Sequence, residues 1–179
     1  MKRSLRTNHT QKLILCALFA ALLCILSPLS VPLGPVPVSL GLFGVLLLSA
    51  TLPPVMSLAS VAVFLTLGAC GLPVFGVGGG ATALIGPTGG YLWGYLPTVL
   101  AVSALSSPAR KKGSPPLLAT LLGVLICYAC GTLHFCLVTR TPLLASLPLT
   151  VLPFLPLDLL KALLAASISR RLRQSLPLA

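Results

Sequence analysis

Long apolar runs that contain almost no charge are the feature that most constrains how this chain can fold. Between Lys12 and Arg170, most of the sequence is uncharged, and the 179 residues include twelve Lys and Arg but only one acidic side chain. About one quarter of a soluble domain is charged, compared with 7% of this chain. The +11 net charge cannot form the solvated basic face of a nucleic-acid-binding protein. The sequence therefore predicts an integral membrane protein that binds no nucleic acid and lies in a lipid bilayer.

Six apolar segments are each predicted to be a membrane helix, because a crossing needs about 20 mostly apolar residues. The whole chain, residues 1–179, is expected to form a single membrane domain. The predicted spans are residues 13–28, 38–52, 53–70, 91–106, 117–138 and 147–169. The expected fold is thus an all-α, six-transmembrane-helix bundle with both termini on the same side.

The basic residues orient this bundle, since cytoplasmic loops carry an excess of Lys and Arg. Arg140 falls in an outer loop, and Lys161 falls inside the last span. With the N terminus inside, the other ten basic residues lie on the cytoplasmic side: Lys2, Arg3, Arg6, Lys12, Arg110, Lys111, Lys112, Arg170, Arg171 and Arg173. We therefore expect both termini to be cytoplasmic.

Two outer segments are rich in glycine and proline. Residues 31–37 read Val-Pro-Leu-Gly-Pro-Val-Pro, and residues 71–90 contain eight glycines and two prolines. Irregular backbone near a bilayer is tolerated where it packs on protein or lines a cavity, and flexible linkers have a different, Ser-rich composition. We therefore expect irregular outer loops that cap a pocket in the helix bundle.

Asp158 and Lys161 are the main candidates for a functional site. Asp158 is the only acidic residue of the chain, Lys161 is the only basic residue inside a predicted span, and a spacing of three places both on one helical face. A charge at this depth costs at least about 2.5 kcal/mol, which favours a functional role; an ion pair that only fixes packing is the alternative. Pro156 predicts that the regular part of the last helix begins there, with Asp158 in its first turns.

The residue inventory argues against an enzyme. The chain has no Glu for a metalloprotease HExxH motif and too few carboxylates for a two-metal site or for nucleotide hydrolysis. Cys127-x-x-Cys130 lacks the second cysteine pair of a metal site, and all six cysteines lie in or beside apolar runs. We expect a binding or transport protein with no metal and no cofactor, for which a partner does any ATP-driven work.

Small residues recur at helical spacing in two predicted spans. Such surfaces let another helix approach closely, from the same bundle or from another subunit. In the first span they are Ala17, Ala20, Ala21 and Cys24. In the fifth span, where we expect internal packing, they are Ala119, Gly123, Cys127 and Gly131.

Three motifs stand out along the chain. They are Gly71-Leu-Pro-Val-Phe75, Gly86-Pro-Thr-Gly-Gly-Tyr91 and Pro153-Phe-Leu-Pro-Leu-Asp-Leu-Leu-Lys161-Ala. With the six spans and the first outer loop, they make the chain resemble the BioY family, the biotin-binding S components of energy-coupling-factor (ECF) vitamin transporters. The resemblance departs at residues 76–80, Gly-Val-Gly-Gly-Gly, where family members often carry a polar side chain.

The resemblance implies high-affinity binding of biotin, for uptake, in an outward-opening pocket of a bacterial cell-membrane protein. It maps the Asp and Lys of the family's last helix onto Asp158 and Lys161. The second motif is expected to add three residues to this site, Tyr91, Gly89 and Gly90. The implied partners are an ECF transmembrane coupling subunit and cytoplasmic ATPase subunits, with docking at Ala17 and Ala21.

Two other functions remain open at the level of the sequence. The first is a small ion- or proton-coupled carrier in which Asp158 and Lys161 form a titrating relay. The second is an assembly subunit whose Asp–Lys pair is structural. Biotin binding separates the leading hypothesis from both, because neither alternative requires it.

Overall fold

The computed structural model describes residues 8–32, 37–76, 79–106 and 116–176. Six of the basic residues used to orient the chain lie outside these ranges: Lys2, Arg3, Arg6, Arg110, Lys111 and Lys112. The same holds for Gly34, Pro35 and Val36 of the first outer loop and for Val77 and Gly78 of the second.

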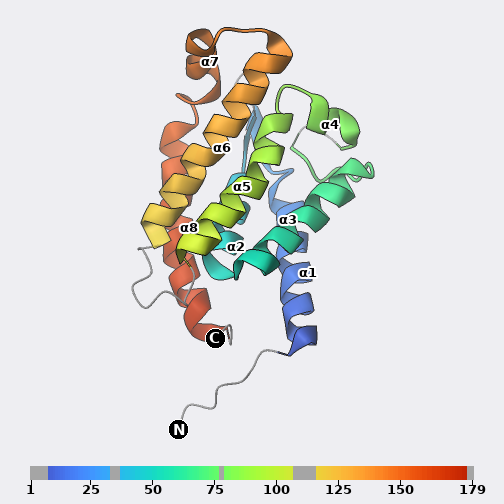
Figure 1. The fold of residues 1–179 in the computed structure, drawn as a ribbon, viewed down its shortest axis with the longest axis vertical. Helices are drawn as coiled ribbons and strands as arrows, with labels where there is room; N and C mark the ends of the chain where they lie inside the picture. The colour runs from blue at the N-terminus through green and yellow to red at the C-terminus, as the bar shows by residue number, and fades with distance from the viewer. Residues whose placement is uncertain (1–7, 33–36, 77–78, 107–115, 177–179) are drawn as a thin grey trace.

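The described chain is mostly helical, and its long helices form an elongated bundle (Figure 1). Helices α5 and α6 pack along one another, α2 packs against α5 and α8, and α3 packs against α1 and α5. The elements in chain order are α1 (His9–Leu26), β1 (Ser30–Pro32), β2 (Pro37–Ser39), α2 (Gly41–Thr51), α3 (Pro54–Ala69), α4 (Ala81–Ile85), α5 (Gly89–Ser106), α6 (Pro116–Thr139), α7 (Leu143–Thr150) and α8 (Leu155–Ser175).

The ends of the helices gather at two opposite poles of the molecule. Figure 1 shows the start of α1, the end of α5, the start of α6 and the end of α8 toward the lower end of the view. Helices α4 and α7 lie toward the upper end. Successive long helices therefore run in alternating directions between the two poles.

By length and composition, two helices can cross a membrane. They are α1, with a mean hydropathy of 1.9, and α6, with a mean hydropathy of 2.1. Helices α7 and α8 together make a third candidate, bent by 59°. The shorter apolar helices α2 and α3 have 11 and 16 residues. The described residues thus contain two or three candidate spans.

The first outer segment corrects the prediction of an irregular loop and of a purely helical fold. Strands β1 and β2 pair antiparallel, with Ser30 opposite Ser39 and Val31 opposite Val38. Pro32 and Pro37 end the ladder, since proline has no N–H to donate. These strands form a short hairpin. Its second strand includes residues 38 and 39, which were predicted to begin the second span.

The last predicted span, residues 147–169, is not one continuous helix. It is divided between α7 and α8 by a break at residues 151–154. Proline removes a helical hydrogen bond and clashes with the preceding turn, so Pro153 and Pro156 account for the break. Helix α8 then begins with Pro156 and Asp158 in its first turn, which confirms the prediction made from Pro156.

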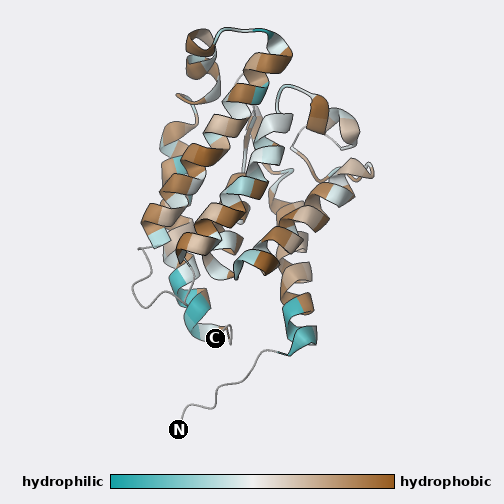
Figure 2. Cartoon of the chain, viewed as in Figure 1, coloured by the Kyte–Doolittle hydropathy of each residue, from teal (hydrophilic) through white to brown (hydrophobic). Residues whose placement is uncertain are grey.

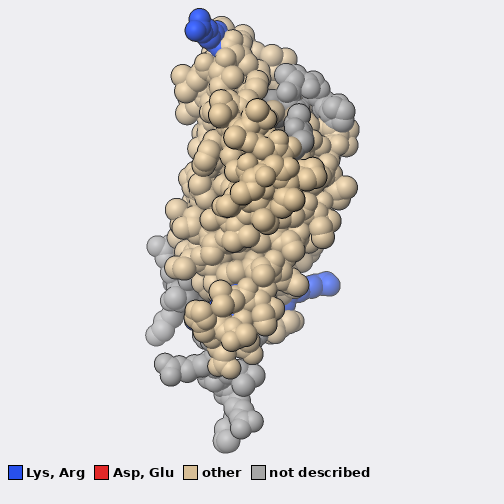
Figure 3. Space-filling view, turned by 90° about the vertical axis from the view of Figure 1, so that its right-hand side faces the viewer, with Lys and Arg blue, Asp and Glu red and all other residues tan. Residues whose placement is uncertain are grey.

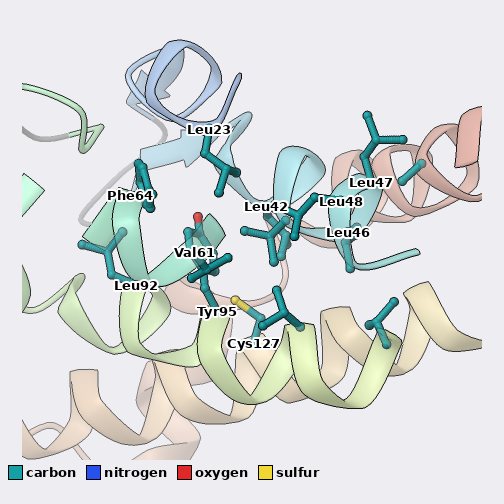
Figure 4. Packing of buried hydrophobic residues seen from close by; sticks show 14 of the residues in the cluster. Leu23, Leu42, Leu46, Leu47, Leu48, Val61, Phe64, Leu92, Tyr95 and Cys127 are labelled. Carbon is teal, nitrogen blue, oxygen red and sulfur yellow. The ribbon is translucent and has the colours of Figure 1, made fainter. Parts of the chain in front are cut away.

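A single apolar core fills the bundle, and much of its outer surface is also apolar. Figure 4 shows part of the core around Phe64, Leu46 and Cys127. Exposed leucines such as Leu137, which is 79% exposed, cover the outside of the helices (Figure 2). On the face in Figure 3, Lys and Arg atoms of the described residues appear at the upper end and in the lower third of the view. An apolar surface between two polar ends is the distribution that a bilayer favours.

The small residues of α6 pack inside the bundle, as the sequence predicted. Ala119 and Cys127 are buried. A Cβ atom at Gly123 would lie 2.6 Å from a methyl carbon of Val102 on α5. This surface lets α5 and α6 approach closely along their length.

Candidate functional site

A partly open cavity lies where the hairpin meets α5, α6 and α8, and the empty space in it and at its open mouth is about 700 Å³. Ligand-binding cavities combine apolar walls with a few polar groups. The apolar lining includes Val38, Leu42, Phe75, Ala83, Leu92 and Phe154. The polar lining comprises Ser27, Ser39, Thr88, Tyr91, Tyr95, Tyr128, Asp158 and Lys161. The cavity thus has the composition of a site for a largely apolar small molecule.

Asp158 and Lys161 form an ion pair in the wall of this cavity. Lys161 Nζ donates to Asp158 Oδ1 at 2.7 Å, and the two residues are only 8% and 4% exposed. Charges removed from water in this way need compensating hydrogen bonds. Two further contacts supply them: the Tyr128 hydroxyl donates to Asp158 Oδ2 at 2.7 Å, and Lys161 Nζ donates to the Ser39 carbonyl at 2.8 Å.

The local structure of α8 also favours the carboxylate. Asp158 lies in the first turn of α8, where the positive end of the helix dipole stabilises a negative charge. Each carboxylate oxygen can accept more than one hydrogen bond, and an ammonium has three N–H donors. Asp158 therefore keeps acceptor capacity, and Lys161 keeps one donor beyond its two contacts.

Tyr91 lines the cavity, and it also holds α7 in place. Its hydroxyl donates to the Thr150 carbonyl at 2.8 Å, and the Thr150 hydroxyl shares a 3.1 Å hydrogen bond with Thr132 on α6. These contacts tie α5 and α6 to the end of α7. They fix the chain just before the break that leads into α8.

Gly89 and Gly90 are not among the residues that line the cavity, and their part in ligand binding stays a prediction. A Cβ atom at Gly90 would lie 2.2 Å from His134 Cβ, and one at Gly89 would lie 2.0 Å from the Leu84 carbonyl oxygen. The two glycines instead allow α5 to approach α6 and the end of α4. Their place in the motif reflects packing of the helix start.

The glycine-rich second outer segment contributes part of the cavity wall. Phe75, Gly76, Ala83 and Thr88 line the cavity, and the Ser30 hydroxyl donates to the Gly76 carbonyl at 3.1 Å. The segment therefore packs on the hairpin, and some of its described residues form part of the cavity wall. The short helix α4 within it was not predicted.

Ala17 and Ala21 are exposed on α1, whereas Ala20 is buried beside Phe19 and Leu23. The small residues predicted to share one face of the first helix thus have different surroundings in the structure. Ala20 packs inside the bundle. Ala17 and Ala21 remain accessible to another helix.

Sequence analysis missed Tyr128 and Ser39 as parts of the charged site. Tyr128 is a lone tyrosine within the apolar sequence of α6, which is a signal that could have marked it. The Ser39 contact has no such signal, because it uses a backbone carbonyl 122 positions from Lys161. Only the folded position of the hairpin reveals it.

Comparisons with known proteins point to one family. A family model described as the BioY family matches residues 1–178. The chain is 36% identical over 167 residues to the biotin transporter BioY of Thermotoga maritima, covering 92% of this chain and 96% of that protein. It is also 36% identical over 160 residues to the probable biotin transporter BioY of Pyrococcus horikoshii, covering 89% and 94%. The crystal structure of an S-component for biotin from an ECF-type ABC transporter matches with a TM-score of 0.85 at 33% identity, covering 92% of each chain.

Proposed function

This chain belongs to the BioY family, and we propose that it binds biotin in the cavity between the hairpin, α5, α6 and α8 for uptake by an ECF-type transporter. It acts as the substrate-binding membrane subunit and not as an enzyme. Biotin is the transported ligand, and no cofactor takes part in its binding. Because the chain has one acidic residue and no nucleotide-binding loop, partner ATPase subunits supply the energy.

The buried Asp158–Lys161–Tyr128 cluster in an otherwise apolar cavity is the observation that carries this proposal. Biotin has two ureido N–H groups, a ureido oxygen, an apolar thioether ring, an alkyl chain and a carboxylate. The spare acceptor capacity of Asp158 suits the ureido N–H groups, and the third N–H of Lys161 suits an oxygen of the ligand. Phe75 and Phe154 offer apolar surface for the ring and chain.

An ion-coupled carrier fits these contacts less well. Both charges of the candidate relay are already paired, and Asp158 is held by Tyr128 at the cavity wall. A relay needs further polar groups that pass a proton or an ion across the membrane. Family membership also favours biotin as the ligand.

The membrane arrangement proposed is six crossings, by α1, α2, α3, α5, α6 and the bent pair α7–α8. The alternating directions of these helices and the positive-inside distribution of Lys and Arg support it. Both termini then lie in the cytoplasm, and the protein is a multi-pass component of the bacterial cytoplasmic membrane. The cavity lies toward the outer pole.

The partners proposed are the ECF transmembrane coupling subunit and two cytoplasmic ATPase subunits. Ala17 and Ala21 support a helix-to-helix contact with the coupling subunit, because both are small and exposed on α1. Such a contact would bring a helix of the coupling subunit close to the backbone of α1.

Equilibrium binding of radiolabelled biotin to the purified full-length protein tests the proposed function. We expect saturable binding that unlabelled biotin displaces and that riboflavin or thiamine does not. Absence of saturable binding by folded protein would reject the proposal. Equal displacement by all three vitamins would reject biotin as the specific ligand.

A further inference from the structure

The Tyr95 hydroxyl faces the cavity from α5. The chain has three tyrosines, and all of them line the cavity. The hydroxyls of Tyr91 and Tyr128 donate hydrogen bonds to Thr150 and Asp158. Among the residues that the structure describes, no protein group pairs with the hydroxyl of Tyr95, although this side chain is only 4% exposed. The Tyr95 oxygen is not among the buried unpaired polar atoms of the described residues, so it is accessible from the cavity and can bond with a bound ligand.

Gly41, the first residue of α2, makes room for this hydroxyl. A Cβ atom at Gly41 would lie 2.8 Å from the hydroxyl oxygen of Tyr95, and 3.1 Å from those of Ser27 and Ser39. Since Cβ contacts below 3.0 Å essentially never occur, any other residue at this position would displace the tip of Tyr95. Figure 4 shows the Tyr95 ring within the core, with its oxygen pointing away from α5. Three hydroxyls therefore converge beside the start of α2.

Ser39 joins this hydroxyl cluster to the charged pair. Its carbonyl accepts from Lys161 Nζ at 2.8 Å, and its hydroxyl accepts from the Gly41 N–H at 2.8 Å. Lys161 in turn is bonded to Asp158. The spare acceptor of Asp158 and the spare donor of Tyr95 are thus parts of one polar wall of the cavity.

We propose that the Tyr95 hydroxyl donates a hydrogen bond to the ureido oxygen of biotin, while Asp158 accepts from a ureido N–H. The proposal rests on the proposed function and makes Tyr95 a specificity-determining residue of the same site. In a ureido ring the oxygen and the N–H groups share one edge, so the protein must offer a donor and an acceptor that are neighbours. The carboxylate of biotin has no N–H beside it and does not need this arrangement.

The variant Tyr95→Phe tests the proposal because it removes only the hydroxyl. Its affinity is measured for biotin and for biotinol, in which an alcohol replaces the carboxylate, with full-length protein in detergent. We expect both ligands to bind more weakly by the same factor, about fivefold to tenfold, from loss of one neutral hydrogen bond. Unchanged affinity for biotin would overturn the proposal. A loss seen with biotin but not with biotinol would also overturn it, by placing Tyr95 at the carboxylate.

Thr98→Val is the matched control. Thr98 lies about one turn further along α5, and its buried hydroxyl donates to the Gly123 carbonyl at 3.3 Å, outside the cavity lining. Its loss should leave both affinities unchanged. A wild-type protein that binds neither ligand would reject the proposed function itself and this inference with it, which is a different outcome from a selective effect of Tyr95→Phe.

Gly41→Ala provides a second test, which can be made in the wild-type background even if Tyr95→Phe is unstable. The added Cβ should displace the Tyr95 hydroxyl and weaken biotin binding in the wild-type background. In the Tyr95→Phe background there is no hydroxyl to displace, so Gly41→Ala should cause little further loss. Equal losses in the two backgrounds would contradict the pairing of Gly41 with Tyr95.

Discussion

At the scale of single residues, the candidate site is an ion pair, Asp158 with Lys161, held by contacts from Tyr128 and Ser39. Asp158 and Lys161 are exceptional by inventory alone, since a charge within an apolar span is costly. Their partner Ser39 comes from the distant hairpin, and no local pattern predicts such a contact. At Gly89 and Gly90 the glycine motif indicates close approach without indicating what approaches, and in the structure the neighbours are Leu84 and His134.

Tyr128→Phe should destabilise the protein more than Tyr91→Phe. The first change removes a hydrogen bond to a carboxylate, worth about 1.5–3 kcal/mol, and the second removes one to a neutral carbonyl, worth about 0.5–1.5 kcal/mol. Equilibrium unfolding of both variants without biotin measures the difference. An equal or smaller loss for Tyr128→Phe would show that its contact with Asp158 contributes little to the free energy of unfolding.

At the scale of elements, apolar periodicity and proline positions predicted most helices within a few residues. The start of α8 at Leu155, next to Pro156, follows from the restricted backbone of proline. The hairpin was missed because its strands have three residues each and are rich in proline, which resembles a loop. Pro156 indicated where α8 begins, but no local pattern gave the 59° bend between α7 and α8.

Gly90→Ala should separate α5 from α6 and destabilise the bundle. The new Cβ would lie 2.2 Å from His134 Cβ and 2.8 Å from the Cys130 carbonyl oxygen, so the helices must shift. Overpacking of this kind costs about 1–3 kcal/mol. Thermal unfolding compared with Ala104→Leu, an exposed position on the same helix, measures the effect. A loss of stability no greater than that of the control would show that the contact between α5 and α6 tolerates a larger side chain at this position.

At the scale of the whole molecule, composition predicted a membrane protein, and the positions of charge predicted its orientation. The six-crossing arrangement is not evident from helix length, because α2 and α3 are short. The contacts within the bundle also do not reveal which surface binds a partner. Topology and docking therefore need direct tests.

Cysteine labelling tests the proposed topology. In a variant without the six native cysteines, a single cysteine at the exposed Ala145 on α7 should react with a membrane-impermeant reagent added outside the cell. One at the exposed Gln174 near the end of α8 should react only after the membrane is opened. Labelling of both from the same side would contradict the six-crossing model.

Replacing Ala17 and Ala21 with Leu should impair assembly with the coupling subunit, because larger side chains prevent close helix approach. Biotin binding by the isolated subunit should persist, since both residues are exposed on α1 and do not line the cavity. Leu18→Phe, which enlarges another exposed side chain of α1, is the matched control. Loss of binding with assembly retained would mean that the face serves the bundle itself.

The affinity of the double variant Asp158→Asn/Lys161→Met for biotin tests the central claim most directly. The paired change leaves neither charge unpaired, and replacing a buried ion pair together is often neutral for stability. If the pair contacts biotin, the folded variant should bind it at least about tenfold more weakly, as loss of a charged hydrogen bond requires. A folded double variant that binds biotin with wild-type affinity would contradict the assignment of Asp158 and Lys161 to the biotin site.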